Sequence, residues 1–428
     1  MRTPLVLCPS STDPPSGHGA PHPASSPRPA RTGPAGAQAL VALALAAVTA
    51  SGCVITIPNS GDGTASASDG DDDGVIPDDP GAATLGWVHQ PNACGRAYGV
   101  IHRDGEAIVV GARDGAPWIA RLGGGGEVIW QHTDTRAGAY FAIDVDPSAA
   151  APGLVAVGRI RDGEVNRAIL DVYDDGGGAL ASHDNLGGAG AGLFGVAAID
   201  GRYVVTGVLA GFDVLLGAFD PVTAALTLWE APAGLGEVSS VGFGLRPTDD
   251  GVIVCGRLSE GMSGRAWIAR YDAEGAPVWE ILGPDPGDGD YQECWSVALG
   301  PEGDPFTAES GSVEARLARY GGGDGALQWA KSELLTGTQA IDTTADGTLY
   351  VGGWSADPAA DPFRAGNTGQ RSGWLSAFNA AGTLLWRAHA AMPLSINALR
   401  VGDGFVTVVG DVDPESACPH AWVGRFSL

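Results

Sequence analysis

The sequence predicts an all-β protein built from repeats, on three observations. Tryptophans twelve residues apart bracket similar text three times, in WIARLGGGGEVIW (118–130), WIARYDAEGAPVW (267–279) and WLSAFNAAGTLLW (374–386). Acidic residue–glycine pairs such as Asp104-Gly105 separate short apolar runs. Such pairs favour hairpins, because glycine tolerates the positive φ of a tight turn. An apolar run that ends near glycine, such as IVVG (108–111), follows these turns, and self-similar text at a fixed spacing is typical of repeat architectures.

Each repeat contains four predicted strands in the same order. The first strand alternates apolar and small or polar residues, as in YGVIH (98–102), FGVAAI (194–199) and WSVAL (295–299). The second follows the turn and ends near glycine, as in LVAVG (154–158), YVVTG (203–207), VIVCG (252–256), LYVGG (349–353) and VTVVG (406–410). The third is the WIAR-type segment, and the fourth ends in tryptophan. Gly111 and Gly410 stand six periods apart, so one repeat spans about 50 residues.

Four antiparallel strands in a repeat of this length are typical of one blade of a β-propeller. A blade has two apolar faces, and neighbouring blades stacked round an axis bury both of them. The chain holds seven such units. We therefore expect an all-β, seven-bladed β-propeller of four-stranded antiparallel blades over residues 83–428.

The two ends of this predicted propeller complement each other. The last unit ends at WVGRFSL (422–428), which leaves no residues for a fourth strand. ATLGWVHQ (83–90) precedes the first unit and reads like a fourth strand, as a comparison with GTLLWRAH (382–389) shows. We expect this N-terminal strand to complete the C-terminal blade and to close the ring.

The repeat text resembles the bacterial propeller repeats of the pyrroloquinoline-quinone-like and SBBP-type families. The resemblance rests on the acidic-Gly turn, the strand that ends in glycine and the W-x-A-R segment, and it covers roughly residues 83–428. It implies the fold and says little about function, because such repeats occur in enzymes, binding modules and scaffolds alike.

Residues 1–52 read as a leader and a lipoprotein signal peptide. A Pro- and Ser-rich region with Arg2, Arg28 and Arg31 precedes the apolar run ALVALALAAVTASG (39–52). That pattern describes a secretory signal, and the run is too short to span a membrane as a helix. Residues 50–53 (ASGC) resemble a bacterial lipobox, which implies cleavage before Cys53 and lipid attachment to it. The alternative is ordinary signal cleavage with Cys53 incidental.

Residues 53–82 are expected to form a disordered acidic tether. The text PNSGDGTASASDGDDDGVIPDDPGAA (58–83) contains small and acidic residues that cannot bury a core. Asp69 to Gly74 matches the first half of an EF-hand loop, but Pro80 occupies the position of the closing glutamate. We therefore favour a linker over a calcium site and expect no metal.

Charge excludes one class of partner. The chain has 24 basic and 50 acidic residues and a net charge of −26. Nucleic-acid binding needs a basic surface, so we expect no nucleic-acid partner. The expected contact with the membrane is the lipid anchor, which gives a bacterial cell-envelope location at the outer membrane or the cell surface.

Four cysteines of the propeller region allow three disulfide pairings. In a propeller, loops between second and third strands share a face with the junctions between blades. This topology favours a Cys94–Cys418 bond across the ring closure and a Cys255–Cys294 bond between the fourth and fifth units; the alternative is buried thiols. CxxC spacing is absent from the sequence, so no zinc ribbon or c-type haem is expected.

The sequence offers no catalytic constellation and no cofactor. GAGLFG (190–195) matches GxGxxG, but a strand follows it in place of the helix that a dinucleotide site needs. No GxSxG motif occurs. His102 ends a predicted innermost strand, and we interpret it as a turn-flanking residue in preference to a channel-facing one.

Variable loops on a rigid scaffold are the expected place for a ligand. An insertion in the sixth unit and the junction between the fourth and fifth units stand out in length. The candidate ligand-face residues are Trp354, Asp357, Asp361, Arg364, Asn367, Arg371, Asp288, Asp290 and Tyr291.

Two functions fit this sequence. The first is a cell-envelope lipoprotein whose monomeric propeller acts as a binding or scaffolding module for a protein or a glycan. The second is an envelope enzyme that uses the propeller funnel, either quinoprotein-like or glycan-acting. The anchor, the repeats and the lack of catalytic motifs favour the first.

Overall fold

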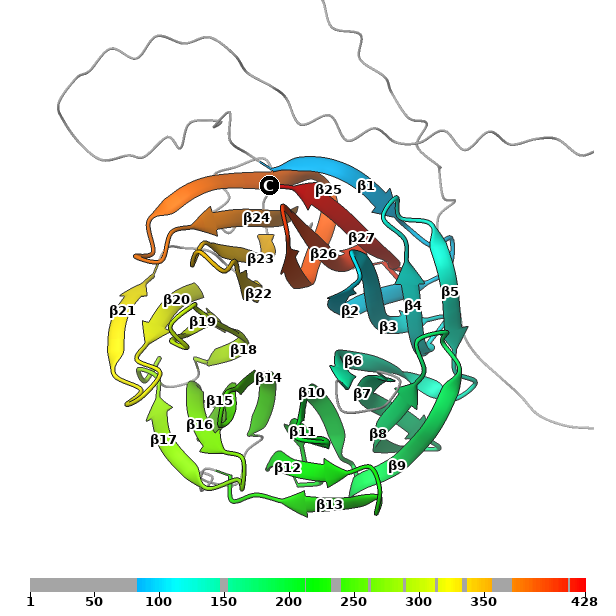
Figure 1. Cartoon of the computed structure of the whole chain (residues 1–428), viewed down its shortest axis with the longest axis horizontal. Helices are drawn as coiled ribbons and strands as arrows, with labels where there is room; N and C mark the ends of the chain where they lie inside the picture. The colour runs from blue at the N-terminus through cyan, green and yellow to red at the C-terminus, as the bar shows by residue number, and fades with distance from the viewer. Residues whose placement is uncertain are drawn as a thin grey trace, which may run out of the picture. The chain divides into compact units, whose positions relative to one another are not determined.

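The computed structural model describes residues 83–146, 153–211, 213–231, 240–260, 263–287, 290–311, 315–332, 337–355, 372–414 and 416–428. These residues form strands only, arranged as seven blades round a central opening (Figure 1). The predicted seven-bladed β-propeller of four-stranded antiparallel blades is confirmed.

The first four blades each use four consecutive strands. Blade 1 contains β2 (Gly95–Arg103), β3 (Glu106–Arg113), β4 (Ala116–Leu122) and β5 (Val128–Thr133). Blade 2 contains β6 (Ala137–Asp146), β7 (Gly153–Asp162), β8 (Val165–Tyr173) and β9 (Ala179–Ala189). Blade 3 contains β10 (Gly192–Ile199), β11 (Arg202–Val208), β12 (Val214–Asp220) and β13 (Ala225–Leu228). Blade 4 contains β14 (Val241–Thr248), β15 (Gly251–Glu260), β16 (Ser263–Asp272) and β17 (Pro277–Leu282).

The last three blades include the ring closure. Blade 5 contains β18 (Gln292–Leu299), β19 (Pro305–Gly311), β20 (Ala315–Tyr320) and β21 (Leu327–Lys331). Blade 6 contains β22 (Thr338–Thr343), β23 (Leu349–Ser355), β24 (Ser372–Phe378) and the first half of β25 (Leu384–Gly402). Blade 7 contains the second half of β25, β26 (Phe405–Val412), β27 (His420–Ser427) and β1 (Thr84–His89).

The ring closes as the sequence predicts. Strand β1 pairs antiparallel with β27, with Val88 opposite Gly424. The Cys94–Cys418 disulfide lies next to this pairing, with its two Cα atoms 4.8 Å apart. The N-terminal strand therefore covers an edge that the C-terminal blade would otherwise leave unpaired.

The apolar core lies between blades. One core cluster joins Ile101 and Ile108 of blade 1 to Tyr140 and Leu154 of blade 2. Another joins blade 1 to blade 7. Because the side chains of a strand alternate between two faces, each blade contributes to the cores on both of its sides.

The repeated fourth-strand tryptophan contacts the following blade. The ring of Trp130 in blade 1 lies against Gly177, in the turn between β8 and β9 of blade 2. Gly177 has a φ of 83°, and a Cβ there would lie 2.6 Å from the ring. Four further pairs repeat this contact, namely Trp87 with Gly126, Trp229 with Gly275, Trp279 with Gly325, and Trp329 with Gly382.

The same turn accepts two hydrogen bonds from the preceding blade. The indole Nε1 of Trp130 donates to the carbonyl of Asp175 over 3.1 Å, and the guanidinium of Arg121 donates to the same oxygen over 3.1 Å. Gly322 and Ala380 accept equivalent pairs of bonds in blades 5 and 6. The spacing of tryptophan, arginine and glycine in the repeat therefore encodes the contact between blades.

Candidate ligand-binding site

The propeller has two different faces. The turns between first and second strands lie on one face, which we call the turn face; Asp104 and Gly105 form such a turn with φ values of 54° and 78°. The loops between second and third strands and the blade junctions lie on the other, which we call the loop face. The predicted ligand residues belong to the loop face.

Three of those predicted residues fall in the described part of the chain. Tyr291 is 44% exposed and forms an isolated bridge with Gly264, whose N–H donates to the carbonyl of Asp290 over 3.2 Å. Trp354 lies near the end of β23, where its N–H donates to the carbonyl of Gly337 over 3.2 Å. Six others lie outside the described residues: Asp288, Asp357, Asp361, Arg364, Asn367 and Arg371. All nine stay candidates.

A hollow of the loop face lies elsewhere on it, where blades 7, 1 and 2 meet. It has a volume of about 640 Å³. Its walls come from the start of β2, the start of β6, the end of β7 and the loop between β26 and β27. Its larger side chains are those of Arg96, Tyr98, Phe141, Arg159, Arg161, Glu164 and Asn166.

The three arginines of this hollow differ in their partners. Arg96 donates to the carbonyl of Pro414 over 2.9 Å and lies 4.0 Å from the buried carboxylate of Asp411. Arg161 and Glu164 form an exposed pair 3.4 Å apart. Arg159 is exposed, its guanidinium carbon lies 5.6 Å from the ring centre of Phe141, and no carboxylate of the described residues lies within ion-pair distance of it.

Phe141 and Tyr98 also belong to a ring of side chains in the central channel. Each of the seven innermost strands has a β-bulge at the same position, and a bulge re-aims the side chain of its extra residue. The seven bulged residues are Tyr98, Phe141, Phe194, Phe243, Trp295, Gln339 and Asn397. All seven are half-buried and line a channel cavity of about 120 Å³.

Five aromatic rings follow one another round this layer. Their centres are separated by 5.1 Å, 4.9 Å, 5.7 Å and 4.3 Å in blade order from Tyr98 to Trp295. Burial raises the pKa of the Tyr98 hydroxyl, so this group stays neutral at ordinary pH. We call these five rings the aromatic arc.

Two amides complete the layer. The Nδ2 of Asn397 donates to the carbonyl of Ala97 over 3.0 Å and to Asp411 over 2.6 Å. Asp411 therefore connects Asn397 in the channel with Arg96 in the hollow. The Oε1 of Gln339 is buried and has no hydrogen-bond partner among the described residues.

A charged layer lies three residues further along four of the innermost strands, nearer the turn face. Asp144 accepts hydrogen bonds from the N–H groups of Val145 and Ala198, each over 2.9 Å, and burial raises its pKa. Asp342 accepts from the N–H of Val401 and lies 3.6 Å from Arg400. Burial lowers the pKa of the fourth member of the layer, Arg246, whose Nε lacks a partner among the described residues.

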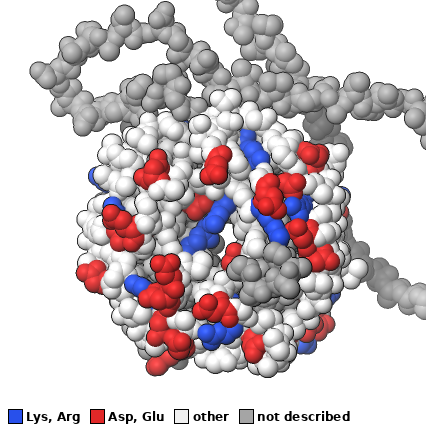
Figure 2. Space-filling view, viewed as in Figure 1, with Lys and Arg blue, Asp and Glu red and all other residues white. Residues whose placement is uncertain are grey.

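The surface view agrees with this distribution of charge. Figure 2 shows basic side chains at the central opening and acidic side chains on the blades around it. In the charged layer of the channel, two arginines are matched by two aspartates.

His102 is engaged between blades 1 and 7. Its Nε2 lies 2.9 Å from the hydroxyl of Thr407, and its ring packs on Phe405 with centres 4.8 Å apart. Burial lowers its pKa to about 4. The histidine is thus a neutral packing residue at neutral pH.

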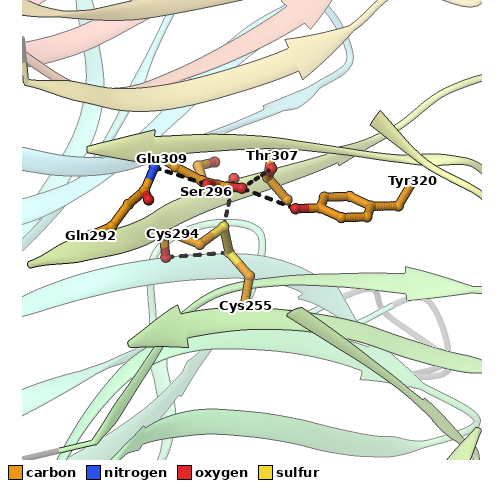
Figure 3. The surroundings of a disulfide bond; sticks show 7 residues. All are labelled: Cys255, Gln292, Cys294, Ser296, Thr307, Glu309 and Tyr320. Atoms are coloured by element: carbon orange, nitrogen blue, oxygen red, sulfur yellow. Dashed lines mark hydrogen bonds between the residues drawn. A yellow bond between two sulfur atoms is a disulfide. The ribbon is translucent and has the colours of Figure 1, made fainter. Parts of the chain in front are cut away.

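The second predicted disulfide joins Cys255 of β15 to Cys294 of β18, with Cα atoms 5.6 Å apart (Figure 3). Beside it lies Glu309, a buried carboxylate that sequence patterns did not single out. It accepts hydrogen bonds from Thr307 over 2.9 Å and from Gln292 and Tyr320 over 3.2 Å each. Burial raises its pKa, and these bonds make it part of the core of blade 5.

Two kinds of site are not found in the described ranges. The described ranges contain no group of three or more side chains arranged to hold a metal ion. The same ranges contain no helix with the length and apolar character needed to cross a bilayer.

Comparisons with known proteins support the fold alone. No protein-family model matches the chain, and a search of curated proteins finds no significant match. The WD40 propeller domain of Doa1 is similar in structure, with a TM-score of 0.53, 10% identity, and coverage of 81% of this chain and 97% of that chain. BamB from Moraxella catarrhalis has a TM-score of 0.46 and 13% identity, with coverage of 81% of this chain and 90% of that chain. The Dos1 propeller has a TM-score of 0.49 and 10% identity, with coverage of 81% of this chain and 95% of that chain.

The resemblance to pyrroloquinoline-quinone-like and SBBP-type repeats therefore stays a prediction. Sequence reasoning predicted a ligand on the loop face but singled out neither the hollow nor the aromatic arc. The sequence does contain a signal for the aromatic arc, since the first residue of each of the strands YGVIH, FGVAAI and WSVAL is aromatic.

Proposed function

We propose that this chain is a lipoprotein of the bacterial cell envelope, attached to the outer membrane or the cell surface through Cys53, whose propeller binds a ligand on its loop face. The observation that carries the proposal is the hollow of about 640 Å³ that shares Tyr98 and Phe141 with the aromatic arc. Its volume lies in the range of about 300–1,000 Å³ that is usual for ligand pockets.

The position of the first strand fits this arrangement. Thr84 pairs with Ser427 close to the turn face, where the N–H of Leu428 donates to the carbonyl of Gly404. A tether that precedes Thr84 would enter the propeller on that side. The hollow lies on the opposite face from Thr84.

Side-chain partners favour binding over catalysis. The channel carboxylates of Asp144 and Asp342 already accept backbone N–H bonds. His102 bonds to Thr407 and packs on Phe405, and no carboxylate of the described residues is hydrogen-bonded to its ring. A general base needs a position beside the proton that it removes, and these groups are committed to the fold.

Capture from envelope extract tests the binding role. The mature protein with a C-terminal affinity tag is compared with Arg159→Ala, which alters the hollow, and with Arg202→Ala, a matched change near the turn face. We expect a specific ligand to be captured by the wild type and by Arg202→Ala but to be depleted with Arg159→Ala. Equal capture by all three, or none across repeated extracts, would refute binding at this hollow.

Mass spectrometry of the native N-terminus tests the anchor. We expect the mature chain to begin at Cys53 with a thioether-linked diacylglycerol, and Cys53→Ala to release the protein from the membrane fraction. An unmodified Cys53 in the mature protein would contradict lipidation without bearing on the hollow.

A further inference from the structure

The residues of the hollow also indicate the class of ligand. We infer that the hollow binds an acidic oligosaccharide, with sugar carboxylates held by Arg159 and Arg96 and a sugar ring packed on the exposed parts of Phe141 and Tyr98. The inference rests on the proposed binding function and deepens it.

Charge is the first argument for an anionic ligand. The chain carries a net charge of −26, yet the hollow brings together three arginines and one glutamate. Arg161 is paired with Glu164, whereas Arg159 has no carboxylate partner among the described residues. An arginine fork matches a carboxylate in two parallel hydrogen bonds, so the unpaired guanidinium provides a ready-made carboxylate site.

Arg96 supplies a second, pre-positioned guanidinium. The carbonyl of Pro414 holds its Nη2, and Asp411 lies 4.0 Å from its Nη1. Asp411 is in turn bonded to Asn397. A side chain that is held in place before the ligand arrives loses little conformational freedom on binding.

The lining of the hollow favours a sugar over a peptide. Apart from the charged and aromatic groups, its walls consist mostly of small residues: Gly95, Ala112, Gly115, Ala137, Gly138, Ala139 and Ala417. Protein partners gain most of their binding energy from aromatic or arginine anchors in well-packed pockets, and small residues form no such pocket. Planar polar groups beside a half-exposed aromatic face suit a sugar ring, which presents hydroxyls at its edge and C–H groups on its face.

The hollow is also rigid, because covalent and backbone bonds tie its three blades together. The Cys94–Cys418 disulfide joins the wall from blade 7 to the wall from blade 1, and the N–H of Gly95 donates to the carbonyl of Pro419 over 2.7 Å. The N–H of Gly138 in blade 2 donates to the carbonyl of Gly115 in blade 1 over 2.8 Å. These bonds fix the backbone segments that line the hollow in blades 7, 1 and 2.

Calorimetric titration of the mature protein tests the inference. The probes are the trimers of galacturonic, glucuronic and mannuronic acid, with a neutral galactose trimer as the matched control. We expect at least one acidic trimer to bind roughly tenfold or more tightly than the neutral trimer, because charge-assisted hydrogen bonds are roughly twice as strong as neutral ones. Its affinity is expected to fall roughly tenfold in Arg159→Ala, to be partly kept in Arg159→Lys and to be unchanged in Arg202→Ala.

Three results would overturn the inference. They are equal binding of acidic and neutral trimers, unchanged binding of the acidic trimers by Arg159→Ala, and no binding of any acidic trimer. A hexaglutamate peptide is titrated in parallel, and tighter binding of this peptide would show an acidic protein ligand instead. If any of these results is found, the capture experiment separates the two proposals. Capture of an extract ligand that depends on Arg159 would still support binding at the hollow. Without such capture, both the binding function and the acidic oligosaccharide would be refuted.

Discussion

The contact between the fourth-strand tryptophan and the turn glycine of the next blade makes a sharp prediction about stability. Gly177→Ala is the perturbation. The alanine Cβ would lie 2.6 Å from Cδ2 and 2.7 Å from Cε3 of Trp130, so the indole has to move. Its hydrogen bond to the carbonyl of Asp175 is then lost or weakened.

Two costs add up at this position. The φ of 83° at Gly177 costs an alanine about 1–2 kcal/mol. Displacement of the indole costs about 1 kcal/mol for the hydrogen bond and about 1 kcal/mol for lost ring packing. We expect Gly177→Ala to lower the free energy of unfolding by about 3–4 kcal/mol. Gly105→Ala is the matched control, because Gly105 has a φ of 78° and no atom within 4 Å of the added Cβ; its expected cost is about 1–2 kcal/mol.

Urea unfolding followed by circular dichroism measures both variants. The same two substitutions are then made in a Trp130→Ala background, where no indole lies over Gly177. There the costs of the two alanines should become equal, since only the backbone term is left. Equal destabilisation by Gly177→Ala and Gly105→Ala in the wild-type background would refute the tryptophan contact as the source of the difference.

Three further outcomes follow from the structure. Deletion of residues 84–89 exposes the edge of β27, and we expect self-association through that edge. Light scattering would detect the self-association. A monomer of unchanged stability would contradict the closing role of β1. The Cys94→Ser/Cys418→Ser variant loses a cross-link between residues 324 apart, and the chain-entropy model gives a loss of stability of at most about 6 kcal/mol. The midpoint of its urea unfolding should therefore fall. An unchanged midpoint would argue against the cross-link. The pKa of His102 is lowered to about 4, so the folded state favours the neutral imidazole. The free energy of unfolding should therefore be at its full value above pH 6.5 and should fall as the pH falls from there to about 4. The loss expected from this histidine is up to about 3 kcal/mol. His102→Gln should show a smaller loss over that range, measured by urea unfolding at pH 7 and pH 4.5, and an identical loss would contradict the assignment.

The sequence predicted the parts of the structure that depend on local text. Asp104-Gly105 predicts a turn because the geometry of that turn depends on only a few neighbouring residues. Trp87 predicts the fourth strand of the last blade because the tryptophans of the other fourth strands allow a direct comparison. Even the Cys94–Cys418 and Cys255–Cys294 bonds could be predicted, since a propeller assigns each loop to one of two faces.

By itself, then, the amino-acid order determined the blade, the number of blades and the closure of the ring, and it predicted a ligand on the loop face. Only the tertiary structure decided where on that face a hollow forms and what lines the channel. Arg96 meets Pro414 across 318 positions of sequence, and no repeat pattern encodes such a meeting. The aromatic first letter of some innermost strands marks the place of the bulges that turn Tyr98 and Phe141 towards the axis. It does not predict their direction, because one extra residue in a strand re-aims a side chain without changing the composition of the strand.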